Sequence, residues 1–200
     1  MGGSPLPFCA LCGDPVAGTI DHDFTCYSCS ATTPAFDGAR SAARYDGVIG
    51  EALRKLKYEQ ALWLAPDLAT LLHNCIQAEY PGLTFDLLVP VPLHHVRKRD
   101  RGYNQSAVLA RELGRILGRK SRAGLLRRIH PTISQTNLTA KERLSNVAKA
   151  FQYKRGKQLA GQKVLLVDDV MTTGATVNAC ANALKKGGAA SVHVITAARG

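Results

Sequence analysis

The stretch Val-Leu-Leu-Val-Asp-Asp-Val-Met-Thr-Thr-Gly-Ala-Thr, residues Val164–Thr176, decides the fold of this 200-residue chain. Its first four residues are apolar and favour β structure, a run typical of a strand buried on both faces. Asp168 and Asp169 follow where we expect that strand to end, and a turn rich in hydroxyl groups comes next. An amphipathic helix then follows, because apolar residues recur at i, i+3, i+4 and i+7 before a Gly-Gly stop: Val177, Cys180, Ala181 and Leu184.

The turn after the two acids has the properties of an anion site. Backbone N–H groups at a helix start lack partners and carry the positive end of the helix dipole, and glycine lets a ligand approach closely. We expect a phosphate monoester at five residues: Thr172, Thr173, Gly174, Ala175 and Thr176. Asp168 and Asp169 precede this turn, where carboxylates can accept hydrogen bonds from ribose hydroxyls and help hold Mg²⁺. The pattern predicts a ribose 5-phosphate site.

An ordinary strand–turn–helix with a hydroxyl-rich cap is the alternative interpretation of this stretch. Two carboxylates at the end of a buried strand are costly without a task, which weighs against that alternative. A P-loop is excluded because the lysine of its motif is absent.

The whole composition favours one α/β domain with a small appendage. Lys and Arg number 26 against 15 acidic residues, so the net charge is +11, and 46% of the residues are apolar. This charge implies a polyanionic partner, either a pyrophosphate-bearing substrate, nucleic acid or both. Apolar runs of membrane-spanning length and a secretory leader are both missing from the sequence, so we expect a cytoplasmic protein without membrane insertion.

Two C-x-x-C pairs near the start of the chain indicate a metal site. Cys9 and Cys12 are separated by 13 residues from Cys26 and Cys29, and each pair can place two thiolates on one tetrahedral Zn²⁺. With all four ligands supplied by protein, we expect a structural zinc site; disulfides are the alternative. We expect the zinc-binding knuckle over residues 1–35 and the main domain over 36–200.

Alternating strands and helices in the main domain predict a mostly parallel twisted sheet with right-handed crossovers. Lys55 and Lys57 are expected on the exposed side of an early helix. We expect strands in five segments: Arg40–Tyr45, Phe85–Val89, Phe151–Tyr153, Lys163–Val167 and Ser191–Ala197. The polar segment 127–143 fits either a mobile cover over the site or an ordinary surface loop.

A basic loop follows the second strand and predicts a second anion site. Parallel strands present their carboxyl ends at one sheet edge, where open α/β sheets bind ligands. Arg97, Lys98, Arg99 and Arg101 place four cations in five positions, and arginine can chelate pyrophosphate oxygens. A solvated basic loop or a nucleic-acid patch is the alternative.

The cationic character continues well beyond this loop. From Arg97 to Arg128 eleven basic residues stand against two acids, a local net charge of +9. This exceeds what one pyrophosphate requires and favours a nucleic-acid surface. Aromatic residues are thinly interleaved in this segment, so backbone tracking is better supported than base stacking. The DNA-binding candidates are Arg97, Lys98, Arg111, Arg115, Arg119, Lys120, Arg127 and Arg128.

The motif of apolar residues, two acids and Thr173-Gly174-Ala175-Thr176 resembles the phosphoribosyl-diphosphate (PRPP) motif of type I phosphoribosyltransferases. The order of motifs along nearly the whole chain is similar to the competence protein ComF family and its gluconate-utilisation relatives. The resemblance rests on the cysteine pairs, the Asp168–Thr176 motif, the Pro90–Leu93 loop running into Arg101–Gln105, and the segment Gln135–Asn146. The main domain also looks like the synthase half of glutamine PRPP amidotransferases.

This resemblance implies a PRPP-binding protein that handles incoming single-stranded DNA during natural transformation, together with other competence or DNA-processing proteins. It implies that Asp168 and Asp169 contact the ribose diol and Mg²⁺, and that Thr172–Thr176 hold the 5-phosphate. It further implies that the loop after the second strand faces the pyrophosphate. The pyrophosphate candidates are Val91, Pro92, Leu93, His94, Arg97, Arg99 and Arg101.

Two departures from purine-base transferases bear on the reaction. Those enzymes usually carry a carboxylate where Thr172 stands here. The chain also ends soon after its last expected strand, so an acceptor base would have to rest on the cysteine segment or the early helices. The alternative to a competence role therefore stays open: a Mg²⁺-dependent phosphoribosyltransferase that acts on an unidentified nitrogen acceptor.

Overall fold

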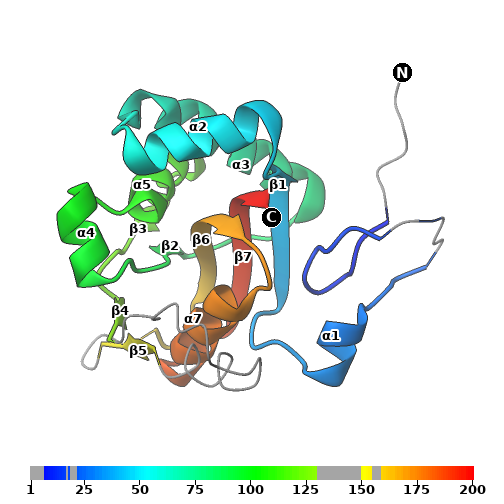
Figure 1. The fold of residues 1–200 in the computed structure, drawn as a ribbon. Helices are drawn as coiled ribbons and strands as arrows, with labels where there is room; N and C mark the ends of the chain where they lie inside the picture. The colour runs from blue at the N-terminus through cyan, green and yellow to red at the C-terminus, as the bar shows by residue number, and fades with distance from the viewer. Residues whose placement is uncertain (1–6, 17, 19–21, 130–149, 155–158) are drawn as a thin grey trace, which may run out of the picture.

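A five-stranded parallel sheet forms the centre of the molecule (Figure 1). The computed structural model describes residues 7–16, 18, 22–129, 150–154 and 159–200. The strands lie in the order β1-β7-β6-β2-β3. Their bounds are β1 Gly38–Arg44, β2 Leu87–Pro90, β3 Lys120–Ser121, β6 Lys163–Met171 and β7 Ser191–Arg199. A separate antiparallel pair joins β4, Leu126–Arg128, to β5, Phe151–Tyr153. The predicted α/β class and parallel sheet are confirmed.

Helices cover both faces of this sheet, with α2, α3 and α5 on one side and α7 on the other (Figure 1). The helical segments are α1 Tyr27–Ala31, α2 Gly47–Tyr58, η1 Leu62–Leu64, α3 Ala65–Glu79, α4 His95–Arg101, α5 Gln105–Leu117 and α7 Ala175–Lys186. Among the described residues, no helix combines the length and apolar character that crossing a bilayer requires.

The strand β6 joins the two halves of the core. Val164 and Leu166 pack with the buried face of α7, whereas Leu165 and Val167 pack with α3 and α5. Burial of alternate side chains on opposite faces explains the continuous apolar run in the sequence. The predicted apolar stripe of α7 is confirmed, because Val177, Cys180, Ala181 and Leu184 are all buried.

The two neighbours of β6 end at different heights. On one side, pairing with β7 continues to Met171. On the other side, pairing with β2 ends where Pro90 lies opposite Val167. The expected end of β6 at Val167 is therefore wrong, because the strand continues to Met171 and includes Asp168 and Asp169. Val167 is only the last residue of β6 that pairs with β2. Both acids consequently lie beyond the end of β2, at the carboxyl edge of the sheet.

One further expectation about a loop is wrong, and another lies mostly outside the described residues. The basic residues expected in a loop form the short helix α4, because after Pro92 the chain contains no residue that breaks a helix until Gly102. Most of the segment 127–143, expected to be a cover or a surface loop, lies outside the described residues.

Candidate functional site

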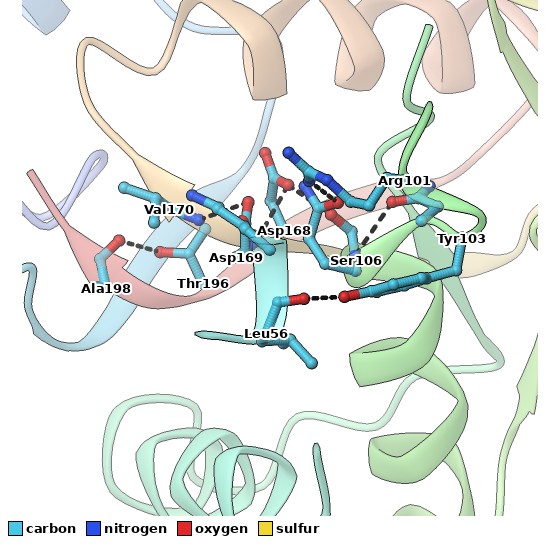
Figure 2. Close-up of polar contacts among 12 residues, drawn as sticks. Leu56, Arg101, Tyr103, Ser106, Asp168, Asp169, Val170, Thr196 and Ala198 are labelled. Carbon is cyan, nitrogen blue, oxygen red and sulfur yellow. Dashed lines mark hydrogen bonds and ion pairs between the residues drawn. The ribbon is translucent and has the colours of Figure 1, made fainter. Parts of the chain in front are cut away.

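Asp168 and Asp169 form a buried acid pair at the sheet edge. The Ser106 hydroxyl on α5 donates to Asp168 Oδ1 at 2.7 Å, and the Asp169 backbone N–H donates to the same oxygen at 3.0 Å (Figure 2). Burial, followed by the neighbouring Asp169 charge, raises the pKa of Asp168 well above its usual range. The fold therefore keeps the Asp168 carboxyl where its charged form is disfavoured, as ligand sites often do.

A lysine from α2 reaches the second acid. Lys57 Nζ lies 2.9 Å from Asp169 Oδ2, and the lysine side chain is 17% exposed. This position corrects the expectation that Lys57 lies on the exposed side of its helix. Lys57 follows the buried Leu53 by four positions, so the helical period places both on one face of α2.

A pocket of about 210 Å³ opens in front of the acid pair, and cations dominate its charged lining. It is lined by Lys57, Tyr58, Val91, Pro92, Leu93, Arg97, Arg101, Asn104, Gln105, Ser106, Arg128, Asp168, Asp169 and Thr176. Four basic side chains thus share one pocket with two carboxylates, an arrangement suited to a phosphorylated sugar with a bound divalent metal.

Most of the predicted pyrophosphate residues gather at this pocket. Five of the seven line it: Val91, Pro92, Leu93, Arg97 and Arg101. His94 is instead buried beside His95, with ring centroids 4.2 Å apart, and Arg99 is outside the lining. The assignment of these residues to pyrophosphate stays a prediction.

Asn104 fixes this loop relative to α5. Its side-chain N–H donates to the Val91 carbonyl at 2.9 Å, and its Oδ1 accepts from the Ser106 backbone N–H at 3.1 Å. The second contact is the helix cap, so the start of α5 and the loop after β2 are held together. Arg101 also donates to Gln105 Oε1 at 2.6 Å (Figure 2). The residue that serves as the helix cap therefore also positions the pocket wall.

The predicted 5-phosphate turn leads into α7 as expected. Gly174 adopts a left-handed conformation with φ 77°, where glycine has no steric cost, and the helix begins at Ala175. Thr176 lines the pocket, whereas Thr172, Thr173, Gly174 and Ala175 are outside its lining. Their role in binding a 5-phosphate stays a prediction.

The DNA-binding candidates separate into groups. Arg97 and Arg128 line the pocket. Arg111 and Arg115 form ion pairs with Glu112 at 3.1 Å and 2.6 Å. Arg119, Lys120 and Arg127 are exposed, and the Lys98 side chain is outside the described part of the chain. The exposed cations occur on α5, at Arg119 after it, on β3 and on β4, and their contact with DNA stays a prediction.

Sequence reasoning assigned no role in the site to five residues of the pocket lining: Lys57, Tyr58, Asn104, Gln105 and Ser106. Lys57 carried a usable signal, since a lysine on the buried face of an amphipathic helix needs a polar partner. Ser106 carried none, because it contacts Asp168 across 62 positions of sequence.

The four cysteines of the two C-x-x-C pairs come together. One ligand atom from each of Cys9, Cys12, Cys26 and Cys29 lies within 4.8 Å of the others, and all four thiols are free of disulfides. This geometry fits one tetrahedral metal ion, and the donor set of four thiolates fits zinc. Burial alone would raise the pKa of Cys9, but backbone hydrogen bonds, one of them from Cys26 N–H, lower it to about 7.

We call the described residues 7–16, 18 and 22–31 the cysteine cap. Its backbone extends the edge of the sheet, because Ala39 N–H on β1 donates to the Leu11 carbonyl at 2.7 Å. Arg199, at the end of β7, donates to the Cys12 carbonyl at 2.9 Å and pairs with Asp14 at 2.8 Å. The cap is therefore attached to the same strand that continues alongside the acid pair.

Comparison with known proteins identifies the domain. Residues 61–200 match the family described as phosphoribosyl transferase domain. Among solved structures, a glutamine phosphoribosylpyrophosphate amidotransferase from B. subtilis, complexed with ADP and GMP, aligns with a TM-score of 0.44 at 21% identity, over 66% of this chain and 26% of that chain. An adenine phosphoribosyltransferase aligns with a TM-score of 0.42 at 17% identity, over 72% and 74%. The family match defines a protein with a phosphoribosyltransferase domain.

Curated relatives narrow this class. Competence protein F of Haemophilus influenzae is 30% identical over 97% of this chain and 85% of its own length. The DNA utilization protein YhgH of Escherichia coli K12 is 33% identical over 93% and 81%, and competence protein ComFC of Bacillus subtilis is 31% identical over 80% and 63%. The chain belongs to the competence protein F family of the phosphoribosyltransferase superfamily, as the sequence motifs predict.

Proposed function

We propose that this protein binds PRPP together with Mg²⁺ in the pocket at the carboxyl ends of β6 and β2, and that it handles incoming single-stranded DNA in the cytoplasm during natural competence. The observation that carries the proposal is the juxtaposition of two buried carboxylates with Lys57, Arg97 and Arg101. Carboxylates suit ribose hydroxyls and Mg²⁺, and the cations suit phosphates.

Each part of PRPP has a matching group in the pocket or next to it. Asp168 and Asp169 hold the ribose hydroxyls and, directly or through water, Mg²⁺. The turn Thr172–Thr176 at the start of α7 accepts the 5-phosphate. Arg97, Arg101 and the loop Val91–His94 face the pyrophosphate. Mg²⁺ held by these carboxylates would supply positive charge next to the phosphates, and Lys57 supplies a cation to Asp169.

The DNA role is supported by relatives and by charge. Relatives named competence protein and DNA utilization protein match over most of this chain. The segment from Arg97 to Arg128 carries a net charge of +9. We also propose a structural zinc ion on the cysteine cap, which fits a reducing compartment such as the cytoplasm. Other competence proteins are the expected partners.

Calorimetric titration with PRPP in the presence of Mg²⁺ tests the pocket. The chain should bind PRPP, and the Asp168→Asn/Asp169→Asn variant should bind it at least about tenfold more weakly, a loss of about 1.4 kcal/mol. Glu51→Gln removes an exposed carboxylate on α2 and serves as the matched control. Equal affinity of all three proteins for PRPP would contradict the assignment.

Salt dependence tests the DNA role. Binding of single-stranded DNA should weaken steeply with salt, and removing one phosphate-contacting arginine, such as Arg127, should reduce the log–log slope by about 1. Arg44→Ala removes an exposed arginine at the end of β1, outside the basic segment, and is the control. Affinity that does not respond to salt is incompatible with backbone tracking.

A further inference from the structure

Exposed aromatic rings stand beside cations at the mouth of the pocket. Tyr58, the last residue of α2, lines the pocket and is 70% exposed. The Arg101 guanidinium lies over this ring, 5.1 Å from its centroid. A ring so exposed adds little to packing, and its contact with arginine leaves most of the ring surface accessible to a ligand.

A second aromatic ring lies beside a cation of α2, just before that helix begins. The Lys57 ammonium lies 5.5 Å from the centroid of the Tyr45 ring, which is 40% exposed. Tyr58, Lys57 and Arg101 line the pocket, and Tyr45 lies next to it through its contact with Lys57. Tyr45 and Tyr58 come from outside the basic segment, so the thin interleaving of aromatic residues expected within that segment does not count them.

A third ring lies close by in the chain. Trp63, on η1, is 72% exposed. The chain folds back immediately after α2, since Ala61 N–H donates to the Lys55 carbonyl at 3.4 Å. The end of α2 meets α4, the helix that carries Arg97 and Arg101, since the Arg101 guanidinium lies over the Tyr58 ring, and η1 follows Tyr58 after three residues. We call Tyr45, Tyr58 and Trp63 the aromatic rim.

We propose that the aromatic rim is a base-stacking surface for single-stranded DNA, with the DNA phosphates held by the neighbouring arginines of α4. Single strands expose the faces of their bases, and aromatic side chains beside cations bind them with little sequence preference. Double-stranded DNA offers its phosphates but not its base faces. The inference rests on the DNA role proposed above and extends it, because it moves the DNA path onto α2 and η1.

The rim also places the DNA next to the PRPP pocket. Tyr58 and Arg101 belong to both surfaces. A base stacked on Tyr58 therefore lies at the pocket mouth, within reach of whatever occupies it. The relation between DNA and the phosphorylated sugar is thus one of direct neighbourhood, without a need for long-range coupling.

The chain contains one tryptophan, so the rim carries its own reporter. Titration with oligothymidylate should quench Trp63 fluorescence, and an oligonucleotide of the same length with abasic positions should not. Tyr58→Ala should weaken oligothymidylate affinity about tenfold, whereas Tyr58→Phe keeps the ring and should stay within roughly twofold. Tyr27→Ala removes a tyrosine that is 89% exposed on the cysteine cap and is the matched control.

The outcomes separate the rim from the DNA role itself. If the unchanged protein binds no single-stranded DNA, the DNA role fails and the rim fails with it. If the protein binds DNA but Tyr58→Ala binds equally well and Trp63 fluorescence is unchanged, only the rim is overturned. If Tyr58→Ala changes the sedimentation of the free protein instead of its DNA affinity, the rim is a contact between copies of the chain and the proposal is wrong.

Discussion

Lys57 and Asp169 form an ion pair that spans 2.9 Å and joins α2 to β6. Both side chains are largely removed from water. Burying the Asp169 charge is costly on its own, so the lysine compensates for it. A bound divalent metal or sugar hydroxyl would act on the same carboxylate. Lys57 therefore stabilises the acid pair and at the same time competes for it.

Replacing Lys57 with methionine should destabilise the protein, because it leaves Asp169 buried without a counter-charge. We expect a loss of about 1–3 kcal/mol in the free energy of unfolding at neutral pH, measured by denaturant unfolding. Lys55→Met breaks an exposed pair with Glu51 on the same helix and should have no measurable effect. Equal losses in the two variants would show that the Lys57 pair behaves as a surface contact.

The raised pKa of Asp168 makes a prediction about pH. Burial, and then the Asp169 charge, raise the pKa of Asp168 in the folded protein. The stability from this group is complete below its unfolded pKa of about 3.9 and is lost as pH rises through the raised folded pKa. Asp168→Asn cannot ionise and its amide oxygen can still accept from Ser106. This variant should be more stable by about 1–2 kcal/mol near neutral pH, although it should lose PRPP binding.

Thermal unfolding across a pH series checks this prediction. The stability advantage of Asp168→Asn should shrink as pH falls and disappear near pH 4 or so, where the native carboxyl is neutral as well. Asp46→Asn alters an exposed carboxylate and should show no such gain. An advantage that grows in acid would mean that the Asp168 carboxylate is stabilised by the fold.

β6 and α7 could be predicted from the sequence because the patterns that indicate them are local. A strand buried on both faces reads as a continuous apolar run, and the helix repeats its apolar residues at a period of 3.6. The cysteine cluster is also local in this sense, since metal ligand spacing is short. The loop after β2 could be placed at the sheet edge because the strand before it ends at proline residues.

The remaining parts of the site depend on contacts between distant residues. Lys57 meets Asp169, and Ser106 meets Asp168, only after α2 and α5 have packed on the sheet. The exposure of Tyr58 and its stacking on Arg101 likewise depend on how α2 and α4 meet. These contacts follow from tertiary packing, which local patterns do not encode.

The metal content of the protein should depend on the cysteines of the cap and not on Cys75. We expect one zinc ion per chain by elemental analysis, retained in Cys75→Ser and lost in Cys12→Ser, since Cys75 lies outside the cluster. Burial raises the pKa of Cys12 to about 11, so metal must displace its proton and affinity should increase with pH. A Cys12→Ser variant that keeps a full equivalent of zinc would contradict the four-thiolate site.

The attachment of the cysteine cap to the sheet can be tested at one glycine. Gly13 adopts φ +67°, and a Cβ atom there would lie 2.6 Å from the Ala39 carbonyl oxygen on β1. Gly13→Ala should therefore add a steric clash to backbone strain and cost about 2–3 kcal/mol of unfolding free energy. Gly82→Ala has a similar φ of +75° but open space around it, so strain alone should cost about 1 kcal/mol.

Because the clash falls on the strand that holds the cap, Gly13→Ala should also increase protease cleavage around the cap, whereas Gly82→Ala should not. Equal effects of the two substitutions on stability and proteolysis would mean that the cap does not rest on β1 through this turn.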